Sequence, residues 1–543
     1  MATVEEIIQQ GRELFGKRDS LLSLWQTLAE NFYPERAEFT STRTLGAEFG
    51  AELMSSHPVR ARRELGDSIS ALLRPTTKDW FFVRTEGDWD SVPLDARAWL
   101  EKAQNIQRRS LAHRGSMFVQ AVKDADHDFV TFGQAVLQRS KNSDGSGLLF
   151  RCWHLKDVAW CDDVNGAVNT VYRKWNATIA DVVGTFGAKA HARVHEKMEK
   201  SRYDKMEIWH CVRPTGKVGK GEKPFESVYI DPANDHMMES VGMPDLGYVI
   251  PRWRKLNGTA YAISPATMTA LPDARLLQAM VAVLLEAGEK AVNPPTVANK
   301  NVFGGAFSIY AGGTTWADMS DGRIQDHYGL LPIDKSGIPL GRDMAADLIN
   351  QIDDSMYLSK LRLPPPPSGG RTAYEVSKIT EENIRQVLPL FEPMEMEYNA
   401  PLMEGTFDAL LSMGAFGPLI EIPKSLEGAS VQFTFESPLQ GAIEAIKRQT
   451  LSEAVGVVAE AQQVDSRSKY LVDMTVAARD VLNGIATPAA WIRSDTQVKE
   501  LADTDAEEQM RAQALIEKQQ KASIAQTEQG TAPAGQGTAP AGQ

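Results

Sequence analysis

The sequence predicts an α+β fold that is predominantly helical, and three observations indicate this class. Apolar residues recur at the helical spacing in the N-terminal part, short aromatic-rich runs typical of strands follow, and two long helices then flank a glycine-rich insert. With 43% hydrophobic and 24% charged residues, the composition is close to the globular average, which excludes a fibrous or wholly disordered chain. A length of 543 residues allows about three or four domains, or one elongated body of several parts.

The net charge and the cysteine content exclude further classes of protein. The formal net charge of −13, from 58 basic and 71 acidic residues, argues against a protein that grips nucleic acid with a broadly basic surface. It does not exclude a protein that encloses DNA without gripping it. Cys152, Cys161 and Cys211 are too few and too irregularly spaced for a disulfide framework or a four-ligand zinc site, so we expect a reducing compartment.

The N-terminus shows no targeting segment, because it is acidic and amphipathic. The longest apolar run, residues 276–285, is interrupted by Gln278 and is too short to cross a bilayer. We therefore expect a soluble protein that is made where it works.

Helices are predicted for the N-terminal part. The first helix carries Ile7, Leu14 and Trp25 at the 3.6-residue period and ends before Pro34. The other predicted helices cover residues 60–73, 94–111 and 118–132.

Strands are predicted for the middle part, which we expect to be a mixed α+β body. Asn165-Gly166 is a strong hairpin signal and lies between the β-prone residues 148–153 and 168–175. Further strands are predicted for residues 206–212, 227–230 and 248–255.

Two long helices are predicted on either side of the glycine-rich insert, at residues 272–292 and 341–361. The first has Pro272 in its first turn and is apolar nearly all round, so it is either a core helix or packed against copies of itself. The second has two faces at 100° per residue. Its apolar face holds Ala345, Ile349, Ile352 and Met356, and near the opposite face lie Asp343, Asp347, Asn350 and Asp354.

The chain then returns through a loop to a helical C-terminal part. Four prolines at residues 364–367 and the following glycines indicate an extended loop, and Thr372 with Glu375 forms a capping box that begins a new helix. Residues 430–436 alternate like a half-buried strand, residues 440–529 are mostly helical, and the repeated Gly-Thr-Ala-Pro-Ala-Gly-Gln of residues 530–543 is expected to be disordered.

A search for catalytic and metal-binding motifs finds none that is specific. The sequence contains no P-loop, no Rossmann fingerprint after a strand and no G-x-S-x-G elbow. His191 and His195 are four residues apart but lack the glutamate of a zincin motif, so an exposed helix face is favoured over a metal site. Cys152, Cys161 and His154 are expected to pack rather than to act in nucleophilic chemistry. We predict no catalytic residue, no metal ligand and no cofactor.

An ordered set of motifs extends from about residue 31 to residue 498. It comprises NFYPERAEF at 31–39, LLRPTTKDWFFV at 72–83, PRWR at 251–254, GTAYAISPATMTAL at 258–271, EKAVNPP at 289–295, RTAYEV at 371–376 and FESPL at 435–439. In this order the motifs resemble the head-to-tail connector, or portal, proteins of short-tailed, T7-like bacteriophages. Tyr261-Ala262 departs from the Tyr-Gly expected there.

The resemblance implies a portal architecture in a ring oligomer, typically of twelve subunits. The implied parts are a wing (1–271), stem helix 1 (272–293), a clip (294–340), stem helix 2 (341–361), a tunnel loop with tunnel helix and wing return (362–439), a helical crown or barrel (440–529) and the disordered tail (530–543).

The resemblance also implies two sets of site residues. Packing between stems of neighbouring subunits would use Leu276, Met280, Val283, Leu284, Ile349, Ile352 and Met356. The tunnel loop and constriction would use Arg362, Leu363, Ser368, Gly369, Gly370, Arg371 and Lys378. The basic residues of this loop either touch phosphates in passing or are ordinary surface charges, and both interpretations stay open.

The polar face of the second long helix is the candidate channel lining. We hypothesise that Asp343, Asp347, Asn350 and Asp354 face the DNA, where rings of negative charge repel phosphate and so allow sliding. The alternative is a solvated outer stripe, because acidic helix faces are common.

The implied function is a portal that forms the channel for genome packaging and DNA ejection and the attachment point for the tail. The implied partners are copies of the chain, double-stranded DNA held without sequence preference, the terminase large subunit, a tail adaptor protein, the major capsid and scaffolding proteins, and internal core or ejection proteins at the crown, with no membrane. The implied location is the virion, at the capsid portal vertex, after assembly in the host bacterial cytoplasm. Two alternatives remain: a non-portal virion adaptor or scaffold that binds partners through its C-terminal helices, and an enzyme with an unrecognised site.

Overall fold

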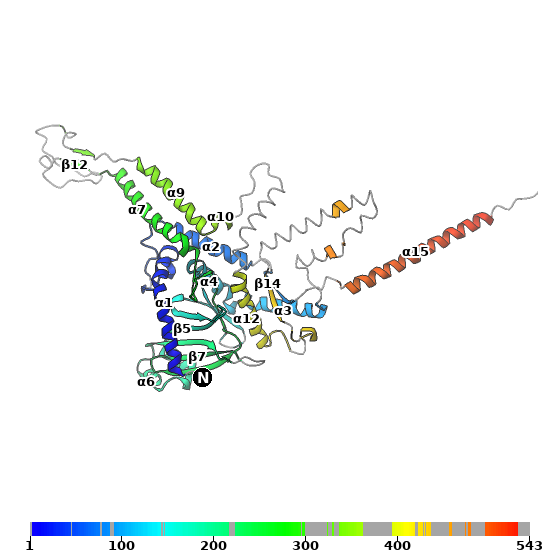
Figure 1. Cartoon of the computed structure of the whole chain (residues 1–543), viewed down its shortest axis with the longest axis horizontal. Coiled ribbons are helices and arrows are strands. Elements are labelled where there is room, and N and C mark those ends of the chain that lie inside the picture. The colour runs from blue at the N-terminus through cyan, green and yellow to red at the C-terminus, as the bar shows by residue number, and fades with distance from the viewer. Residues whose placement is uncertain are drawn as a thin grey trace, which may run out of the picture. The chain divides into compact units, whose positions relative to one another are not determined.

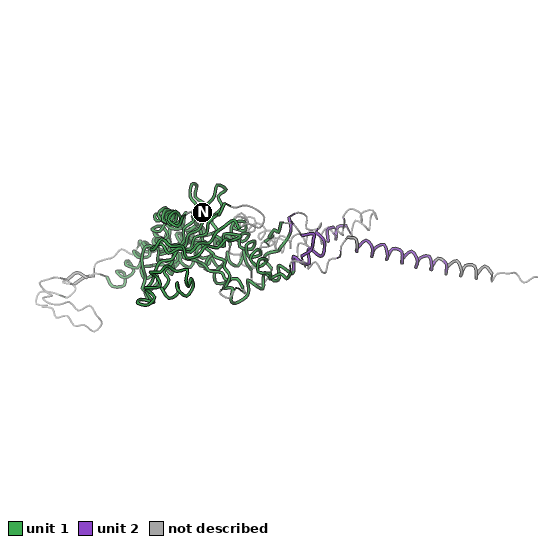
Figure 2. The backbone as a smooth tube through the Cα atoms, turned by 90° about the horizontal axis from the view of Figure 1, so that it is seen from below, with its two compact units in different colours: residues 1–84, 102–419, 430–443 green, residues 85–101, 420–429, 444–543 purple. Residues whose placement is uncertain are grey.

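A computed structural model of the chain describes most of three stretches. These are residues 3–361 with gaps at 45, 76–78, 87–91, 143–144, 146, 217–222, 295 and most of 299–335; residues 394–435 with gaps at 419–421, 427 and 429; and residues 495–529, beside a few isolated turns. The fold is mixed α+β and mostly helical (Figure 1). Figure 2 colours its two compact units, residues 1–84, 102–419 and 430–443, and residues 85–101, 420–429 and 444–543.

The N-terminal helices agree closely with their predicted ranges. They are α1 (Val4–Phe32), α2 (His57–Leu73), α3 (Leu94–Ala112) and α4 (Phe118–Phe132). A capping box of Thr3 and Glu6 begins α1. Gly133, with φ of 77°, ends α4 in the left-handed conformation that glycine adopts most readily. These helices form where the apolar periodicity is long.

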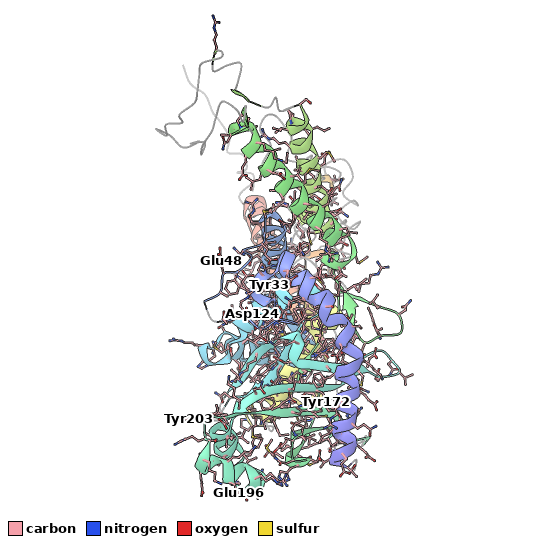
Figure 3. The ribbon with its side chains drawn as sticks, turned by 90° about the vertical axis from the view of Figure 1, so that its left-hand side faces the viewer. Tyr33, Glu48, Asp124, Tyr172, Glu196 and Tyr203 are labelled. Atoms are coloured by element: carbon pink, nitrogen blue, oxygen red, sulfur yellow. The ribbon has the colours of Figure 1, made fainter. Side chains whose placement is uncertain are left out.

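A five-stranded antiparallel sheet follows in simple chain order. Its strands are β4 (Val158–Asp162), β5 (Val168–Thr178), β6 (Lys205–Pro214), β7 (Phe225–Asp231) and β8 (His236–Met243). One face packs against α1, where Ile8 and Phe15 meet Tyr172 and Trp209 (Figure 3). The other face packs against α5 (Ile179–Phe186) and α6 (Ala192–Lys200).

Several elements of this region differ from the predicted ones. The Asn165-Gly166 hairpin joins β5 to β4, and β4, β8 and α5 were not predicted. The helix expected around His191 and His195 is α6. The predicted strand at 248–255 divides into β9 (Tyr248–Val249) and β10 (Arg254–Lys255), which pair with different partners. His191 is not on a helix face, because it caps α6 by accepting a hydrogen bond from the Arg193 amide. The described residues contain no cluster of three or more groups suited to a metal.

Smaller elements connect the sheet to the rest of the first unit. β2 (Val136–Lys141) pairs with β3 (Leu148–Trp153) and β9, β10 pairs with β11 (Ala262–Ile263), and β1 (Phe81–Thr85) pairs with β14 (Val431–Phe435). A π-helical turn (Glu395–Asn399) leads into α12 (Ala400–Ser412), whose Leu402, Met403 and Leu410 are buried. Within the second unit, α15 (Asp495–Gln529) agrees with the helix predicted there, and its side chains are largely exposed at residues 497–516.

A buried histidine in the sheet makes stability depend on pH. The ring of His210 hydrogen-bonds the Tyr248 hydroxyl at 2.8 Å and the Ser227 hydroxyl at 2.9 Å. Burial, with a further contribution from Arg173, lowers the pKa of His210 from 6.5 to about 3. Because the unfolded chain takes up a proton as pH falls below 6.5 and the folded chain does not, acidification favours unfolding.

We expect His210 alone to remove about 2 kcal/mol of unfolding free energy between pH 7 and pH 5. Urea unfolding at the two pH values measures this loss, and His210→Gln should reduce it. Substituting the exposed His113 with glutamine serves as the control, and an equal change in both variants would refute the assignment.

Candidate functional site

Two long helices, α7 (Leu271–Val292) and α9 (Gly337–Ser355), lie side by side and extend away from the sheet (Figure 1). α7 continues from a π-helical turn (Ala266–Ala270), so the helical run begins before Pro272. The 22 residues of α7 span about 33 Å. The two helices are in close contact at Gly341, where an added Cβ would lie 2.7 Å from Leu284 Cδ2. Glycine at this position lets the two backbones approach.

α7 presents much of its apolar surface outward. Only Leu271, Ala274 and Leu277 are buried along it. Leu276 and Val283 are 51% and 61% exposed, while Met280 and Leu284 are half-buried. The segment Ala266–Val292 is also the described helix that is long and apolar enough to cross a membrane, and it is longer than the apolar run at residues 276–285 that the sequence indicates. No residue that the structure describes covers these exposed apolar side chains.

The apolar face of α9 is used differently. Ala345 and Leu348 are buried, and Ile352 and Met356 are completely buried within the chain. The expectation that Ile352 and Met356 pack between subunits is therefore corrected, because they have no surface left for a neighbour. Ile349 is half-buried.

α9 does not continue to residue 361 as predicted. It begins at Gly337, ends at Ser355, and a separate turn, α10 (Leu358–Leu361), follows. Tyr357 has φ of 57°, which interrupts the helix, and its ring stacks on Trp253 with centroids 6.2 Å apart. A non-glycine residue in this conformation indicates that the tertiary contact outweighs the local helical preference.

The acidic stripe of α9 lies on the surface. Asp343, Asp347, Asn350 and Asp354 are all exposed, on the side away from Ala345 and Ile352. The single chain therefore presents a wall of carboxylates on α9, as the helical arithmetic predicted for this face.

The base of the helix pair is held by polar contacts that the sequence reading missed. Gln278, the polar interruption of the apolar run, donates its side-chain amide to the Ser55 carbonyl at 2.8 Å and accepts from the Ser55 amide at 2.7 Å. His57 Nε2 lies 2.9 Å from a carboxylate oxygen of Asp353, next to the stripe. The signal available in the sequence was Gln278 itself, since an amide in an apolar helix needs a partner.

The tunnel-loop residues lie outside the described residues, as do most of the predicted clip and much of the predicted crown. Those tunnel-loop residues are Arg362, Leu363, Ser368, Gly369, Gly370, Arg371 and Lys378. Of the clip, the structure describes the short antiparallel pair β12 (Thr296–Ala298) and β13 (Tyr328–Leu330).

The helix pair therefore presents an exposed apolar surface on α7 and an exposed acidic surface on α9. Comparison with known proteins identifies the family of the chain. A family model described as "Bacteriophage head to tail connecting protein" matches residues 4–492, and the chain therefore belongs to this family. The family is structural and not enzymatic, and its members act as the portal, or head-to-tail connector, of the phage virion.

Two curated relatives are similar over most of their length. The portal protein of Salmonella phage epsilon15 is 24% identical over 540 residues, covering 96% of this chain and 95% of that protein. A probable portal protein of Bordetella phage BPP-1 is 23% identical over 463 residues, covering 83% and 81%. Among solved structures, a chain from the virion of a native gene transfer agent particle covers 74% of this chain and 86% of its own length, at 11% identity and a TM-score of 0.31. Family membership implies an oligomeric ring at the portal vertex, with capsid and tail partners.

Proposed function

We propose that α9 lines the DNA channel of the portal ring and that α7 packs between neighbouring subunits. The observation that carries this proposal is the division of one helix pair into an exposed acidic face and an exposed apolar face. Closing a ring covers the second face and leaves the first facing the channel.

The acidic face suits a channel through which double-stranded DNA moves. Asp343, Asp347 and Asp354 would each form a ring of carboxylates, twelve in number if the ring has the twelve subunits that the resemblance implies. Phosphates near such rings are repelled, so no counterion-releasing contact holds the DNA in place. The net charge of −13 is consistent with a protein that surrounds DNA without binding it tightly.

The apolar face suits packing against a second copy of the chain. Leu276, Val283 and Leu285 are between 51% and 61% exposed, and each gains about 1.5–3 kcal/mol when fully buried relative to full exposure. This surface therefore favours a neighbouring subunit over water. The half-buried Met280, Leu284 and Ile349 would extend the contact.

The finer assignments follow the resemblance and the ordered motifs. We assign residues 1–271 to the wing, 294–340 to the clip, 362–439 to the tunnel loop, tunnel helix and wing return, and 440–529 to the crown, among connectors of short-tailed, T7-like phages. The terminase large subunit, tail adaptor, major capsid and scaffolding proteins would be partners, with internal core or ejection proteins at the crown. Leu501, Met510, Leu515 and Ile516 of α15 are 44–64% exposed, which is consistent with a crown of helices packed together. Assembly would take place in the host bacterial cytoplasm.

Reversing the charge of the stripe tests the channel lining. Asp347→Lys with Asp354→Lys should reduce DNA packaged per procapsid about tenfold, because lysines facing the channel bind phosphate and retard sliding. Packaging of nuclease-protected DNA measures the effect. The matched control is Glu196→Lys with Glu199→Lys on α6, which makes the same change in charge at exposed positions.

Ring formation is measured first on the same variants. Mass photometry should show particles of about 720 kDa, the mass expected for twelve copies of a 59.8 kDa chain. Intact rings that package DNA as well as the α6 control would show that the stripe faces outward.

A further inference from the structure

A cavity on the side of the sheet covered by α5 contains a buried arginine. The cavity has a volume of about 390 Å³ and lies between the five-stranded sheet, α5 and the end of β3. Its apolar lining comes from Trp153, Trp175, Val182, Phe186, Ile208 and Tyr229. Arg173 and the exposed Arg151 also line it.

Strand register brings the polar lining together. Arg173 on β5 is opposite His210 on β6, His210 is opposite Tyr229 on β7, and Tyr229 is opposite Glu239 on β8. Directly opposed residues project from the same face of a sheet, so this row crosses the cavity side of the sheet. Tyr172, next to Arg173 in sequence, packs instead with α1 on the other face.

Arg173 is only 6% exposed, and its side chain also interacts with the Tyr248 side chain. The Cζ atom of Arg173 lies 3.9 Å from the centre of the Trp153 ring and 4.0 Å from the centre of the Trp175 ring. Trp153 is itself fixed, since its indole N–H donates to Gln138 Oε1 at 2.7 Å. The Nε of Arg173 is buried and has no hydrogen-bond partner in the part of the chain that the structure describes.

The nearby acids are engaged elsewhere, and no described carboxylate forms an ion pair with Arg173. Glu239 pairs with Lys189 Nζ at 2.7 Å, and Asp181 accepts from the Thr178 hydroxyl at 2.6 Å. Burial raises the pKa of Asp157, and its attraction to Lys156 is stronger than its attraction to Arg173. Arg173 is thus a buried cation stacked between two aromatic rings, and no described carboxylate lies within ion-pair distance of it.

Buried charges in proteins are almost always paired, because desolvating an isolated ion is costly. A carboxylate matches the planar fork of a guanidinium better than any other common anionic side chain. We propose that this cavity binds a carboxylate carried by a peptide segment of a partner protein, with a neighbouring apolar side chain of that peptide against the aromatic lining.

The surrounding charges favour a carboxylate over a phosphate. Asp181 and Glu239 lie at the same cavity and repel a dianion more strongly than a monoanion. The apolar lining also suits a peptide residue rather than a hydrated inorganic ion. This binding site is separate from the channel and does not depend on the role of α9.

Titration calorimetry of the full chain with three peptides tests the proposal. The probes are acetyl-Gly-Phe-Asp-Phe-Gly-amide, its Asp→Asn counterpart, and acetyl-Gly-Gly-Phe with a free C-terminal carboxylate. The aspartate peptide or the free-carboxylate peptide should bind at least tenfold more tightly than the asparagine peptide, and which of them binds distinguishes a side-chain from a C-terminal source. Equal affinity of all three peptides would overturn the proposal.

Variants assign the binding to Arg173. Arg173→Met should weaken the carboxylate peptide at least tenfold, whereas Arg202→Met, at an exposed arginine stacked on Tyr203, should not. If Arg173→Met does not fold, Arg173→Lys keeps the charge but loses the planar fork and should also weaken binding. Unchanged affinity in the Arg173 variant, or inorganic phosphate that competes as well as the peptide at equal ionic strength, would refute a peptide-carboxylate site.

Discussion

Replacing Arg74 with methionine should lower the free energy of unfolding by about 3–5 kcal/mol. The side chains of Arg74 and Asp126 form an ion pair in which they are 5% and 1% exposed. Arg74 also donates to Asn399 Oδ1 at 2.6 Å and lies over the Tyr398 ring at 4.6 Å. Without Arg74, the Asp126 carboxylate is left buried and uncompensated. Urea unfolding of the purified chain measures the loss.

A double variant distinguishes the effect of removing the whole Arg74–Asp126 ion pair from the effect of leaving Asp126 without its partner. Arg74→Met combined with Asp126→Leu removes both charges and should recover much of the stability, because an apolar pair of similar volume often replaces a buried ion pair without loss. If the single variant costs less than about 1 kcal/mol, or if the double variant is less stable than the single one, the ion pair does not hold this region in the way described.

Replacing Gly133 with alanine should cost about 2–4 kcal/mol, the sum of a backbone and a packing penalty. Gly133 has φ of 77°, and an added Cβ would lie 2.4 Å from the backbone carbonyl carbon of Ile263. The Gly133 carbonyl accepts the Trp253 amide at 2.7 Å, so the backbone is fixed at this point. The atoms that the added Cβ would meet belong to the backbone of Ile263 and Ser264, which cannot move aside as a flexible side chain can. The change in urea midpoint measures the effect.

A second glycine isolates the backbone contribution. Gly258 has φ of 79°, but an added Cβ there meets nothing within 4 Å. Gly258→Ala should therefore cost only about 1 kcal/mol. Similar losses at the two positions would show that the contact with Ile263 contributes nothing.

Sequence reasoning was most successful where a single periodic pattern decided the outcome. α4 and β3 have the predicted bounds, and α7 differs by a single residue at its start. It missed β4 and β8, the edge strands of the five-stranded sheet, and α5, which packs on that sheet. Clarity of the pattern decided what was predictable more than length did, because the six-residue β3 was predicted and the eight-residue β8 was not.

For the candidate site, the two faces of α9 were predictable from the sequence, but the residues against which its apolar face packs were not. The arithmetic of 100° per residue separated Asp347 from Ile352 correctly. It could not tell whether Ile352 and Met356 would pack within the chain or against a neighbour, and they pack within it. The sequence shows no pattern for the Arg173 cavity, because its lining comes from β3, from four strands of the five-stranded sheet and from α5.

The contacts at the base of α7 and α9 have a mechanical consequence. Gln278 on α7 hydrogen-bonds the Ser55 backbone, and the Asp353 carboxylate on α9 contacts the His57 ring. Both helices are therefore held by residues 55–57 at the start of α2. If the helix pair tilts relative to α2, either the contacts of Ser55 and His57 break or residues 55–57 move with the helices. In a ring, a change in the tilt of α7 and α9 would therefore move residues 55–57 and, through them, α2 of the same subunit.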